Sequence, residues 1–513
     1  MLQQNFAYIL EKKAFLHPKD IAIAEAYNSK TYTYDDLCHR SSRLANALKD
    51  AGVERGDRIS CLTANSVEYI DIFMAAARLG ALLTPLNHRL APLEMIRILG
   101  DAKPKVFIFD GEFGDVAREI AAANLNFNLI LYFGSGEFSW AKRMEEIVTQ
   151  YGVVGPEIAG DSEDPLLMLY TAGSTGRPKG VPLKQTNLFF NSINWILDVG
   201  ITKEDYTLTV IPLFHIGGHM LWTLPHLIVG AKILLQRRFE PETTLRLLTQ
   251  EKITNVYFIP AMAKMILALP HWKDYDLSRL RFIGAGGEPV PERVTNAFGE
   301  IGIPVLNSYG LTETSDGTTT IRPRDALGKP ANCIGKPLTL TDARIVDSQG
   351  RDVGVGVEGE ILHRGPSVVN EYWNRPEESS KAFRDGWLHT GDRAVRDEAG
   401  FIHFLGRKDD MIITGGENVY PAEVEEVILS YPKVADVAVI GMPDEKWGQT
   451  VKAIIAPKSG SDIDEQEILD HIKTRLSGFK RPRIIQFVES LPKIGSGKLD
   501  RVTIKNMYGM KIK

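Results

Sequence analysis

The chain has 513 residues, of which 44% are hydrophobic and 24% are charged, as in an ordinary globular protein too long for one hydrophobic core. Its 60 Lys and Arg residues and 65 Asp and Glu residues give a net charge of −5, which provides no general attraction to nucleic acid or to an anionic membrane. The three cysteines, Cys38, Cys61 and Cys333, lie too far apart for a C-x-x-C metal or redox motif.

Neither a signal peptide nor a transmembrane segment is expected. The N-terminal stretch MLQQNFAYILEKKAF is interrupted by Glu11, Lys12 and Lys13. The most apolar segment, residues 220 to 235, contains Pro225 and Lys232, which a membrane span tolerates poorly. Together with the sparse cysteines, these features favour a cytoplasmic protein.

Two stretches of alternating short apolar runs and amphipathic segments predict parallel β-α-β units. The first reads RISCL, SVEYIDIFMAAARLG, ALLTPLN, PLEMIRILGDA and KVFIFD between residues 58 and 110. The second extends from Thr207 to Gly310 and includes TLTVIP, AKILLQ, NVYFIP, LRFIGAGGE and PVLNSYG. In both, a glycine (Gly80 or Gly230) stands between helix and strand as a helix C-cap would, which indicates a weak internal duplication.

The pattern changes after about Gly335. Short alternating runs such as DARIVDSQGRDVGVGVEGEILHRG suggest a barrel-like antiparallel unit, and a mixed tail follows FIHFLGRKDD. We therefore predict an α/β protein: a large N-terminal domain of two doubly wound sheets plus a β-barrel-like subdomain, and a small mobile α+β C-terminal domain. The predicted boundaries are residues 1–406 for the first domain, 407–409 for a hinge and 410–513 for the second.

The segment YTAGSTGRPKG, residues 170–180, has the composition of a phosphate-binding loop, because glycines let backbone N–H groups turn toward an anion. It does not match the motif G-x-x-x-x-G-K-[ST], since Pro178 stands where the second glycine of a match starting at Gly173 would be. By itself such a run is more often a solvated surface loop.

Several further motifs occur where open α/β sheets place their ligands, in loops that follow strands. They are PLFHIGG (212–218), GAGGEPVP (284–291), NSYGLTE (307–313), HTGD (389–392), GRKDDMI (406–412) and PKIGSGK (492–498). With TAGSTGRPKG, and in this order, they resemble the motifs of the adenylate-forming superfamily, which includes acyl-CoA synthetases, the adenylation domains of peptide synthetases and beetle luciferases. The resemblance extends over essentially the whole chain.

The resemblance implies how ATP and Mg²⁺ are held. The loop from Thr171 to Lys179 would close over the β- and γ-phosphates, and Thr175 and Glu313 would hold Mg²⁺. The loop contacts implied are Thr171, Ser174, Thr175, Gly176 and Lys179. The family usually has a hydroxyl residue where Ala172 stands, so one phosphate contact is expected to be missing here.

The resemblance also implies the remaining nucleotide and catalytic residues. Those implied for the adenine slot and the turn that follows it are Gly286, Gly287, Glu288, Asn307, Ser308, Tyr309, Gly310 and Thr312. Asp392 would accept the ribose hydroxyls, Arg407 would touch the ribose or phosphate, and Lys498 would bridge the carboxylate and α-phosphate oxygens. His215 would gate the acyl site, and Gly415 and Gly416 would line the passage for the pantetheine arm of coenzyme A.

The implied reaction is acyl-CoA synthesis: a carboxylic acid attacks the α-phosphate of ATP, pyrophosphate leaves, and a thiol then attacks the acyl adenylate. Residues expected around the acid are small or apolar, namely Gly217, Gly218, Met220, Leu221, Gly284, Ala285 and Thr314. They favour a hydrophobic fatty or aryl acid. Amino-acid-activating relatives typically carry Asp where His215 stands, so free coenzyme A is the expected acceptor. The alternatives are an enzyme that loads a carrier protein and a nucleotide-binding regulator without turnover.

Overall fold

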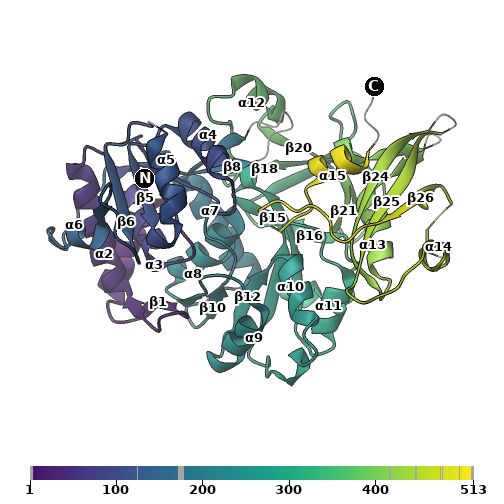
Figure 1. Ribbon diagram of the computed structural model, residues 1–513, viewed down its shortest axis with the longest axis horizontal. Coiled ribbons are helices and arrows are strands. Elements are labelled where there is room, and N and C mark those ends of the chain that lie inside the picture. Colours follow the sequence, from purple (N-terminus) through teal and green to yellow (C-terminus); the bar gives the residue numbers. More distant parts are fainter. Residues whose placement is uncertain are drawn as a thin grey trace.

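The computed structural model describes residues 4–123, 125–171, 178–414, 417–444, 447–473, 475–476, 478–495 and 497–509. In Figure 1 the chain runs from the N-terminal sheets on the left to a smaller C-terminal unit on the right. Among the described residues, no helix is long and apolar enough to cross a membrane.

The first β-α-β stretch lies in a sheet that, in the described part of the chain, has seven strands in the order β7-β6-β5-β3-β4-β8-β9, parallel except for the final β8–β9 pair. Its strands are β3 (Arg58–Leu62), β4 (Leu82–Pro85), β5 (Val106–Asp110), β6 (Leu129–Phe133), β7 (Lys142–Arg143), β8 (Pro165–Thr171) and β9 (Lys179–Lys184). The accompanying helices are α1 (Phe6–Leu16), α2 (Tyr34–Asp50), α3 (Val67–Leu79), α4 (Pro92–Ala102), α5 (Gly114–Ala122) and α6 (Met144–Val148).

Helix α3 lies in the hydrophobic interior because its sequence is apolar on nearly every side. The Ser66 side chain caps its start by accepting a hydrogen bond from the Tyr69 N–H, and Gly80 ends it in the left-handed conformation with φ 66°. Gly230 ends α8 (Leu224–Val229) in the same way with φ 90°. Both glycine C-caps predicted from the sequence are therefore confirmed.

The second β-α-β stretch and the barrel-like strands join into one sheet. Among the described residues, fourteen strands form it, in the order β17-β18-β20-β21-β16-β15-β14-β13-β12-β10-β11-β1-β2, with β19 beside β20. Strands β10 to β14 pair in parallel, and the antiparallel pairs β14–β15 and β15–β16 connect them to the barrel-like part. The subdomain predicted after Gly335 thus continues the second sheet.

The bounds of these strands are β1 (Ile21–Glu25), β2 (Thr31–Thr33), β10 (Tyr206–Thr209), β11 (Lys232–Leu235), β12 (Asn255–Phe258), β13 (Phe282–Gly286), β14 (Val305–Leu311), β15 (Asp316–Thr320), β16 (Cys333–Pro337), β17 (Asp342–Val346), β18 (Gly359–Arg364), β19 (Phe383–Arg384), β20 (Trp387–Arg396) and β21 (Ile402–Arg407). The helices are α7 (Gln185–Val199), the π-helix η3 (Gly217–Thr223), α8, α9 (Pro241–Gln250), α10 (Pro260–Leu267), α11 (Glu292–Gly299) and α12 (Pro376–Ala382).

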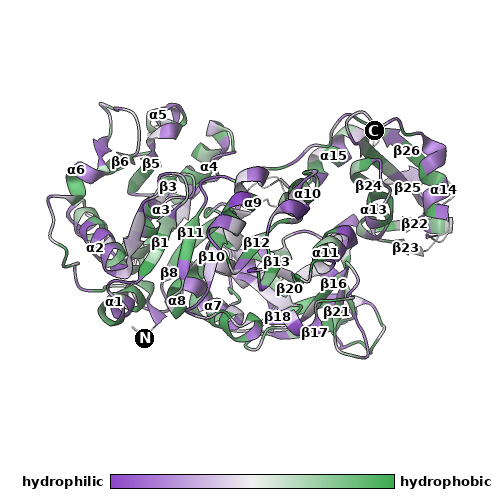
Figure 2. Cartoon of the chain, turned by 90° about the horizontal axis from the view of Figure 1, so that it is seen from below, coloured by the Kyte–Doolittle hydropathy of each residue, from purple (hydrophilic) through white to green (hydrophobic). Residues whose placement is uncertain are grey.

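The tail forms a separate small α+β unit. Its strands are β22 (Ile412–Thr414), β23 (Glu417–Val419), β24 (Val434–Asp444), β25 (Gly448–Pro457) and β26 (Ile484–Phe487), and its helices are α13 (Pro421–Leu429), α14 (Glu465–Lys473) and α15 (Arg501–Tyr508). In the described part of the chain, each hydrophobic cluster lies either wholly before Arg407 or wholly after Asp410. Figure 2 shows that its helices α13 and α14 contain both hydrophobic and hydrophilic residues. The predicted small C-terminal domain is therefore confirmed.

Candidate active site

The predicted phosphate loop connects the antiparallel strands β8 and β9. Thr171, the last residue of β8, is paired with Lys179, the first residue of β9. The intervening residues 172–177, which include the predicted contacts Ser174, Thr175 and Gly176, lie outside the described residues. The hairpin nevertheless fixes both ends of the loop at the edge of the seven-stranded sheet.

Lys179 and Glu313 are brought together through Tyr372. The Lys179 ammonium lies 4.4 Å from the centre of the Tyr372 ring, a cation–π contact. The Tyr372 hydroxyl donates a hydrogen bond of 2.8 Å to Glu313 Oε1. Glu313 lies in the 3₁₀ turn η5 (Thr312–Thr314), and its carbonyl accepts a hydrogen bond of 2.9 Å from Val369 N–H. The loop lysine and the predicted magnesium ligand therefore share one wall.

Asp392 is almost fully buried, with 2% of its surface exposed, in a pocket of polar groups from three strands. The Tyr309 hydroxyl on β14 donates a hydrogen bond of 2.5 Å to its Oδ2, and Arg407 Nε lies 3.2 Å from its Oδ1. Burial raises the pKa of Asp392, while Arg407 and the Tyr309 hydrogen bond oppose that shift. Its Oδ1 is ion-paired with Arg407 but accepts no hydrogen bond from the described residues, so it can still accept one from a ligand.

The glycines predicted for the adenine slot permit close backbone approach. A Cβ on Gly286 would lie 2.4 Å from the Tyr257 hydroxyl, and Gly287 has φ 83°, a conformation that favours glycine. Ser308 Oγ lies 2.8 Å from the same Tyr257 hydroxyl and donates to the Ala285 carbonyl. The Asn307 amide instead donates to the carbonyls of Ala331 and Cys333, which ties β14 to the segment around the start of β16.

Lys498 from the small domain reaches this glycine turn. Its Nζ lies 3.6 Å from where a Cβ of Gly287 would be. Burial lowers the pKa of Lys498, opposed by the nearby carboxylates of Glu288 and Asp316. The loop that carries it docks on the large domain, where Arg89 donates a hydrogen bond to the Gly495 carbonyl. The two domains thus assemble the site jointly.

His215 lies near Lys498. Burial lowers the pKa of His215 to about 3, and the cationic side chains of Lys498 and Arg89 and the neighbouring His88 add to the effect. Its Nε2 is sealed from solvent and has no hydrogen-bond partner among the described residues. A neutral imidazole therefore faces the site.

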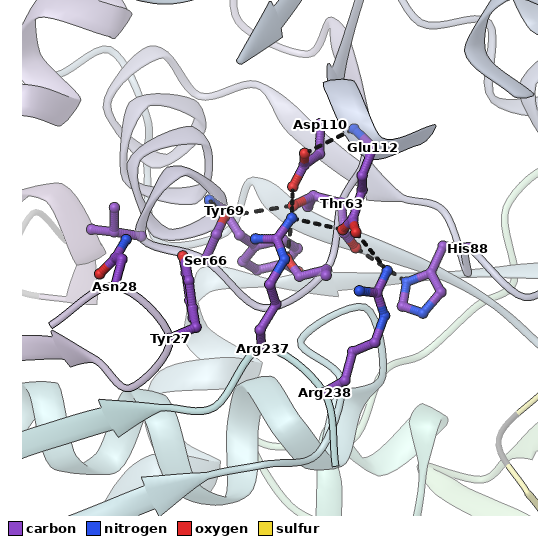
Figure 3. A network of polar contacts seen from close by, with 12 residues as sticks. Tyr27, Asn28, Thr63, Ser66, Tyr69, His88, Asp110, Glu112, Arg237 and Arg238 are labelled. Atoms are coloured by element: carbon purple, nitrogen blue, oxygen red, sulfur yellow. Dashed lines mark hydrogen bonds and ion pairs between the residues drawn. The ribbon is translucent and has the colours of Figure 1, made fainter. Parts of the chain in front are cut away.

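Beside this histidine, a polar network connects the two sheets (Figure 3). Arg237, after β11, pairs with Asp110 at the end of β5 and with Glu112 in the turn η2 (Gly111–Phe113). His88 stacks on Phe113 with ring centres 5.1 Å apart. A cavity of about 420 Å³ opens among Arg237 and the acidic residues, but none of the predicted site residues lines it. The network positions the sheets relative to each other.

Several residues around the site were not predicted from the sequence. Tyr372 lies in the run NEYWNRP, which has no feature that singles out a site tyrosine. Trp222 lies in the π-helix η3, and Asp316 follows the turn that carries Glu313. Two of these had a detectable signal: η3 begins at the Gly217-Gly218 pair of the motif PLFHIGG, and Asp316 lies three residues after the motif NSYGLTE.

The described residues fit ATP and Mg²⁺. Asp392 Oδ1 is a buried acceptor whose contact with Arg407 is an ion pair and not a hydrogen bond, and Gly287, exposed and without a side chain, presents bare backbone to a flat ring. Magnesium is commonly held by one or two carboxylates together with phosphate oxygens and water, and Glu313 offers one such carboxylate. Among the described residues, no group of three or more His, Cys, Asp and Glu side chains forms a metal site of its own.

The sequence matches two family models: AMP-binding enzyme over residues 10–373, and AMP-binding enzyme C-terminal domain over residues 423–498. A feruloyl-CoA synthase of Amycolatopsis is 36% identical over 488 residues, covering 95% of this chain and 96% of the relative. An indoleacetate–CoA ligase of Aromatoleum aromaticum is 36% identical over 507 residues, covering 98% of each. The crystal structure of the anthranilate CoA ligase AuaEII with anthranoyl-AMP has a TM-score of 0.91 at 28% identity, covering 98% of this chain and 96% of the other.

The chain therefore belongs to the AMP-binding enzyme family. It is an acid–thiol ligase of the AMP-forming type, as the adenylate-forming motifs indicated. Enzymes of this type use ATP with Mg²⁺ to convert a carboxylic acid into an acyl adenylate, and then transfer the acyl group to coenzyme A; this is the activity of the chain.

Proposed function

We propose that the acid is a compact hydrophobic one, an aryl acid in preference to a long-chain fatty acid, and that Lys498 acts on it directly. The observation that carries the proposal is the position of Lys498. Its side chain is half-buried beside Gly287, its charge is partly desolvated, and it forms no ion pair with a described residue. A partly desolvated cation that no carboxylate contacts directly is stabilised most when a ligand supplies the negative charge.

Aromatic side chains support the choice of acid. Trp222 on η3 packs against Trp195 and Tyr257, with ring centres 5.7 and 5.1 Å apart. A Cβ on Gly284 would lie 2.4 Å from Tyr257, and one on Gly317 would lie 2.3 Å from Trp195. The space behind the two glycines is therefore already filled, which favours a flat ring over an extended chain. The side chains of Met220 and Leu221 lie outside the described part.

In the first half-reaction, the formation of the acyl adenylate, each group of site residues would have its own role. Lys498 would neutralise the oxygens of the acid and the α-phosphate as they approach, and the Lys179 loop would hold the β- and γ-phosphates as pyrophosphate leaves. Mg²⁺ on Glu313 and Thr175 would supply further neutralisation of the phosphate charge. Asp392 would orient the ribose through Oδ1, with Arg407 paired to the same carboxylate, and neutral His215 would flank the acid.

The second half-reaction would need the small domain to turn. Arg407 pairs with Asp392 in the large domain, whereas Asp410 pairs with Lys505 at 2.7 Å within the small domain. This change of partners supports a large domain of residues 1–406, a hinge at 407–409 and a mobile domain of 410–513. Rotation would withdraw Lys498 and bring Gly415 and Gly416, which lie outside the described residues, to the pantetheine passage.

A cytoplasmic location is part of the same proposal. All three cysteines are free thiols, and Cys61 and Cys333 are buried, as expected where disulfides do not form. The competing functions predict other products: a carrier-protein ligase would transfer the acyl group to a carrier protein, and a regulator without turnover would transfer none.

The test is a panel of aryl and fatty acids assayed for AMP and pyrophosphate with and without coenzyme A. We expect aryl acids to give the highest kcat/KM, and coenzyme A to yield a thioester. Turnover only with a phosphopantetheinylated carrier protein would make the chain a carrier-protein ligase. Long-chain acids outperforming aryl acids would contradict the assigned acid.

A further inference from the structure

Asp316, the first residue of β15, has a strained backbone. Its φ is 94° and that of the preceding Ser315 is 57°, and among the described residues these are the only two consecutive non-glycine residues with positive φ. Residues other than glycine adopt such conformations at an energetic cost, and they persist where the surrounding structure enforces them.

The surrounding contacts do enforce this conformation. The Asp316 carbonyl accepts a hydrogen bond of 2.6 Å from Thr314 Oγ1, and the Asn191 amide donates to the carbonyls on either side, those of Thr314 and Gly317. Gly310, opposite on β14, allows the close approach, because a Cβ there would lie 1.5 Å from the Asp316 carbonyl oxygen. The backbone is therefore held so that the Asp316 side chain has a fixed position.

The Asp316 side chain is also energetically unfavourable, because one of its oxygens is buried without a partner in the described part of the chain. The Oδ2 atom of Asp316 is sealed from solvent and has no hydrogen-bond partner among the described residues. Burial raises the pKa of Asp316 to about 7, opposed by the Lys498 ammonium. Buried carboxylate oxygens are normally paired, so an unpaired one held by a strained backbone indicates a missing ligand group.

The carboxylate lies in the wall of the acid site. It is near enough to Lys498 and Tyr257 to affect the pKa of both. The strand β15 that carries it contacts η3, the π-helix of Trp222. Trp222 Nε1 is likewise buried without a hydrogen-bond partner among the described residues. An apolar wall would suit a plain hydrocarbon acid, but this wall holds two polar atoms without partners.

A free carboxylate at this place works against an unsubstituted acid. The Asp316 carboxylate repels the carboxylate of the substrate. In addition, an acid that covers Asp316 Oδ2 without donating a hydrogen bond to it leaves this oxygen unpaired. An acid that carries a hydrogen-bond donor avoids the energetic cost of the unpaired Oδ2. We propose that the Asp316 carboxylate accepts a hydrogen bond from a hydroxyl or amino group on the aryl acid, so that the enzyme selects acids bearing such a donor. This inference rests on the proposed function, whose acid site it refines.

The experiment compares matched pairs of acids: benzoate with its hydroxy and amino derivatives, and cinnamate with hydroxycinnamates. For each acid, kcat/KM is measured by pyrophosphate release in the wild type, Asp316→Gly and Asp316→Asn. Glycine accepts the positive φ and removes the carboxylate, whereas asparagine keeps an acceptor oxygen of the same shape. Lys252→Gly, which relieves a positive φ of 55° away from the site, is the matched control.

In the wild type, we expect the best donor-bearing acid to exceed its unsubstituted partner by roughly 10- to 100-fold, since a site built for a hydrogen bond rejects an analogue that lacks it. Asp316→Gly should reduce that ratio to near one without lowering the melting temperature. Asp316→Asn should retain part of the ratio, and Lys252→Gly should retain all of it.

Two results would overturn the inference while leaving the proposed function intact. One is turnover of aryl acids with no preference within any pair. The other is an equal loss for all acids in Asp316→Gly, which would mean that Asp316 merely positions Lys498. Failure of every acid to release pyrophosphate would instead reject the proposed function, and the inference with it.

Discussion

At the scale of single residues, Lys498 is held by its backbone alone. The Lys498 carbonyl accepts a hydrogen bond of 2.8 Å from Ile494 N–H, and Lys493 and Leu499 on either side form an antiparallel bridge. A turn of this kind presents the ammonium without fixing it to a neighbouring side chain, so the charge can enter and leave the site with the domain.

Lys498→Ala should slow adenylation by at least ~10²-fold, the scale of losing one preorganised electrostatic group. Thioester formation from a supplied acyl adenylate should be nearly unchanged, because by then the lysine has left. The measurement is a pair of single-turnover assays, one from ATP and acid and one from synthetic adenylate and coenzyme A. Lys498→Arg should restore only part of the first rate, since a planar guanidinium fills a different space. Comparable losses in both assays would assign Lys498 a structural role.

His219 is a buried histidine that makes the stability of the fold depend on pH. It is fully buried between Tyr69 and Phe73, with ring centres 5.4 and 4.3 Å away, and neither ring nitrogen has a hydrogen-bond partner among the described residues. Burial lowers the pKa of His219 to about 3. Below the unfolded-state pKa of about 6.5, the unfolded chain binds a proton that the folded chain does not, so stability falls as the pH falls from about 6.5 toward 3.

His219→Phe should therefore flatten the acid side of the stability profile. The expected gain in the free energy of unfolding is about 1–2 kcal/mol near pH 5, because one titrating site contributes up to about 1.4 kcal/mol per pH unit. At pH 8 the two proteins should differ by less than about 1 kcal/mol. The measurement is the melting temperature from pH 4.5 to 8. An offset of the same size at every pH would show that packing and not proton binding accounts for the change.

At the scale of elements, the close approach of strands β14 and β15 on either side of the turn η5 requires a glycine at position 310. Gly310 pairs with Gly317 across the hairpin, and a Cβ at Gly310 would overlap backbone atoms, which cannot move aside as a flexible side chain can. The turn in between carries Glu313. Displacement of β15 would therefore shift Glu313 and Asp316 together.

Gly310→Ala should lower the free energy of unfolding by about 3 kcal/mol or more, as strained backbone substitutions do, and should abolish adenylation. The matched control is Gly100→Ala in α4, where a Cβ would meet nothing within 4 Å. That change should stabilise the protein by about 0.5–1 kcal/mol, the helix preference of alanine over glycine. Melting temperatures and pyrophosphate release measure both effects. A Gly310→Ala variant with normal stability and activity would disprove the packing argument.

Sequence patterns predicted those helices, strands and loops that are determined by residues close together in the chain. Helix α3 followed from its apolar run between Ser66 and Gly80, and the carboxyl ends of the strands located the ligand loops. The insertion of the β1–β2 hairpin beside β11 was not predicted, because it depends on a pairing between Ile23 and Ile233 that no local pattern encodes. Tyr372 was missed for the same reason, because its contacts with Lys179 and Glu313 exist only in the folded chain. Asp316 stands close to a predicted motif, but its unpaired Oδ2 and its proximity to Lys498 are features of the folded chain alone.

At the scale of the whole molecule, the two domains meet through few polar contacts. Glu426 on α13 accepts a hydrogen bond of 3.0 Å from Glu292 N–H, and Tyr420 donates one to Glu358. No described hydrophobic cluster crosses between the domains. An interface of this kind can open without exposing a core, as the proposed rotation requires.

The connection between the domains offers a direct test of that rotation. Lys408 is the first residue of the 3₁₀ turn η7 (Lys408–Asp410), and Arg407 before it has φ −83° and ψ 141°, the extended conformation that a following proline requires. Lys408→Pro should therefore preserve the described orientation while restricting the change of dihedral angles that a hinge needs.

We expect Lys408→Pro to form acyl adenylate within about threefold of the wild-type rate but to transfer the acyl group to coenzyme A at least ~10²-fold more slowly, because the rotation that presents the thiol passage is blocked. Lys408→Ala, which removes the same side chain and leaves φ free, should perform both steps normally. The two single-turnover assays used for Lys498 measure both rates. If the proline variant transferred the acyl group as fast as the alanine variant, the domain movement would have to take place elsewhere in the chain.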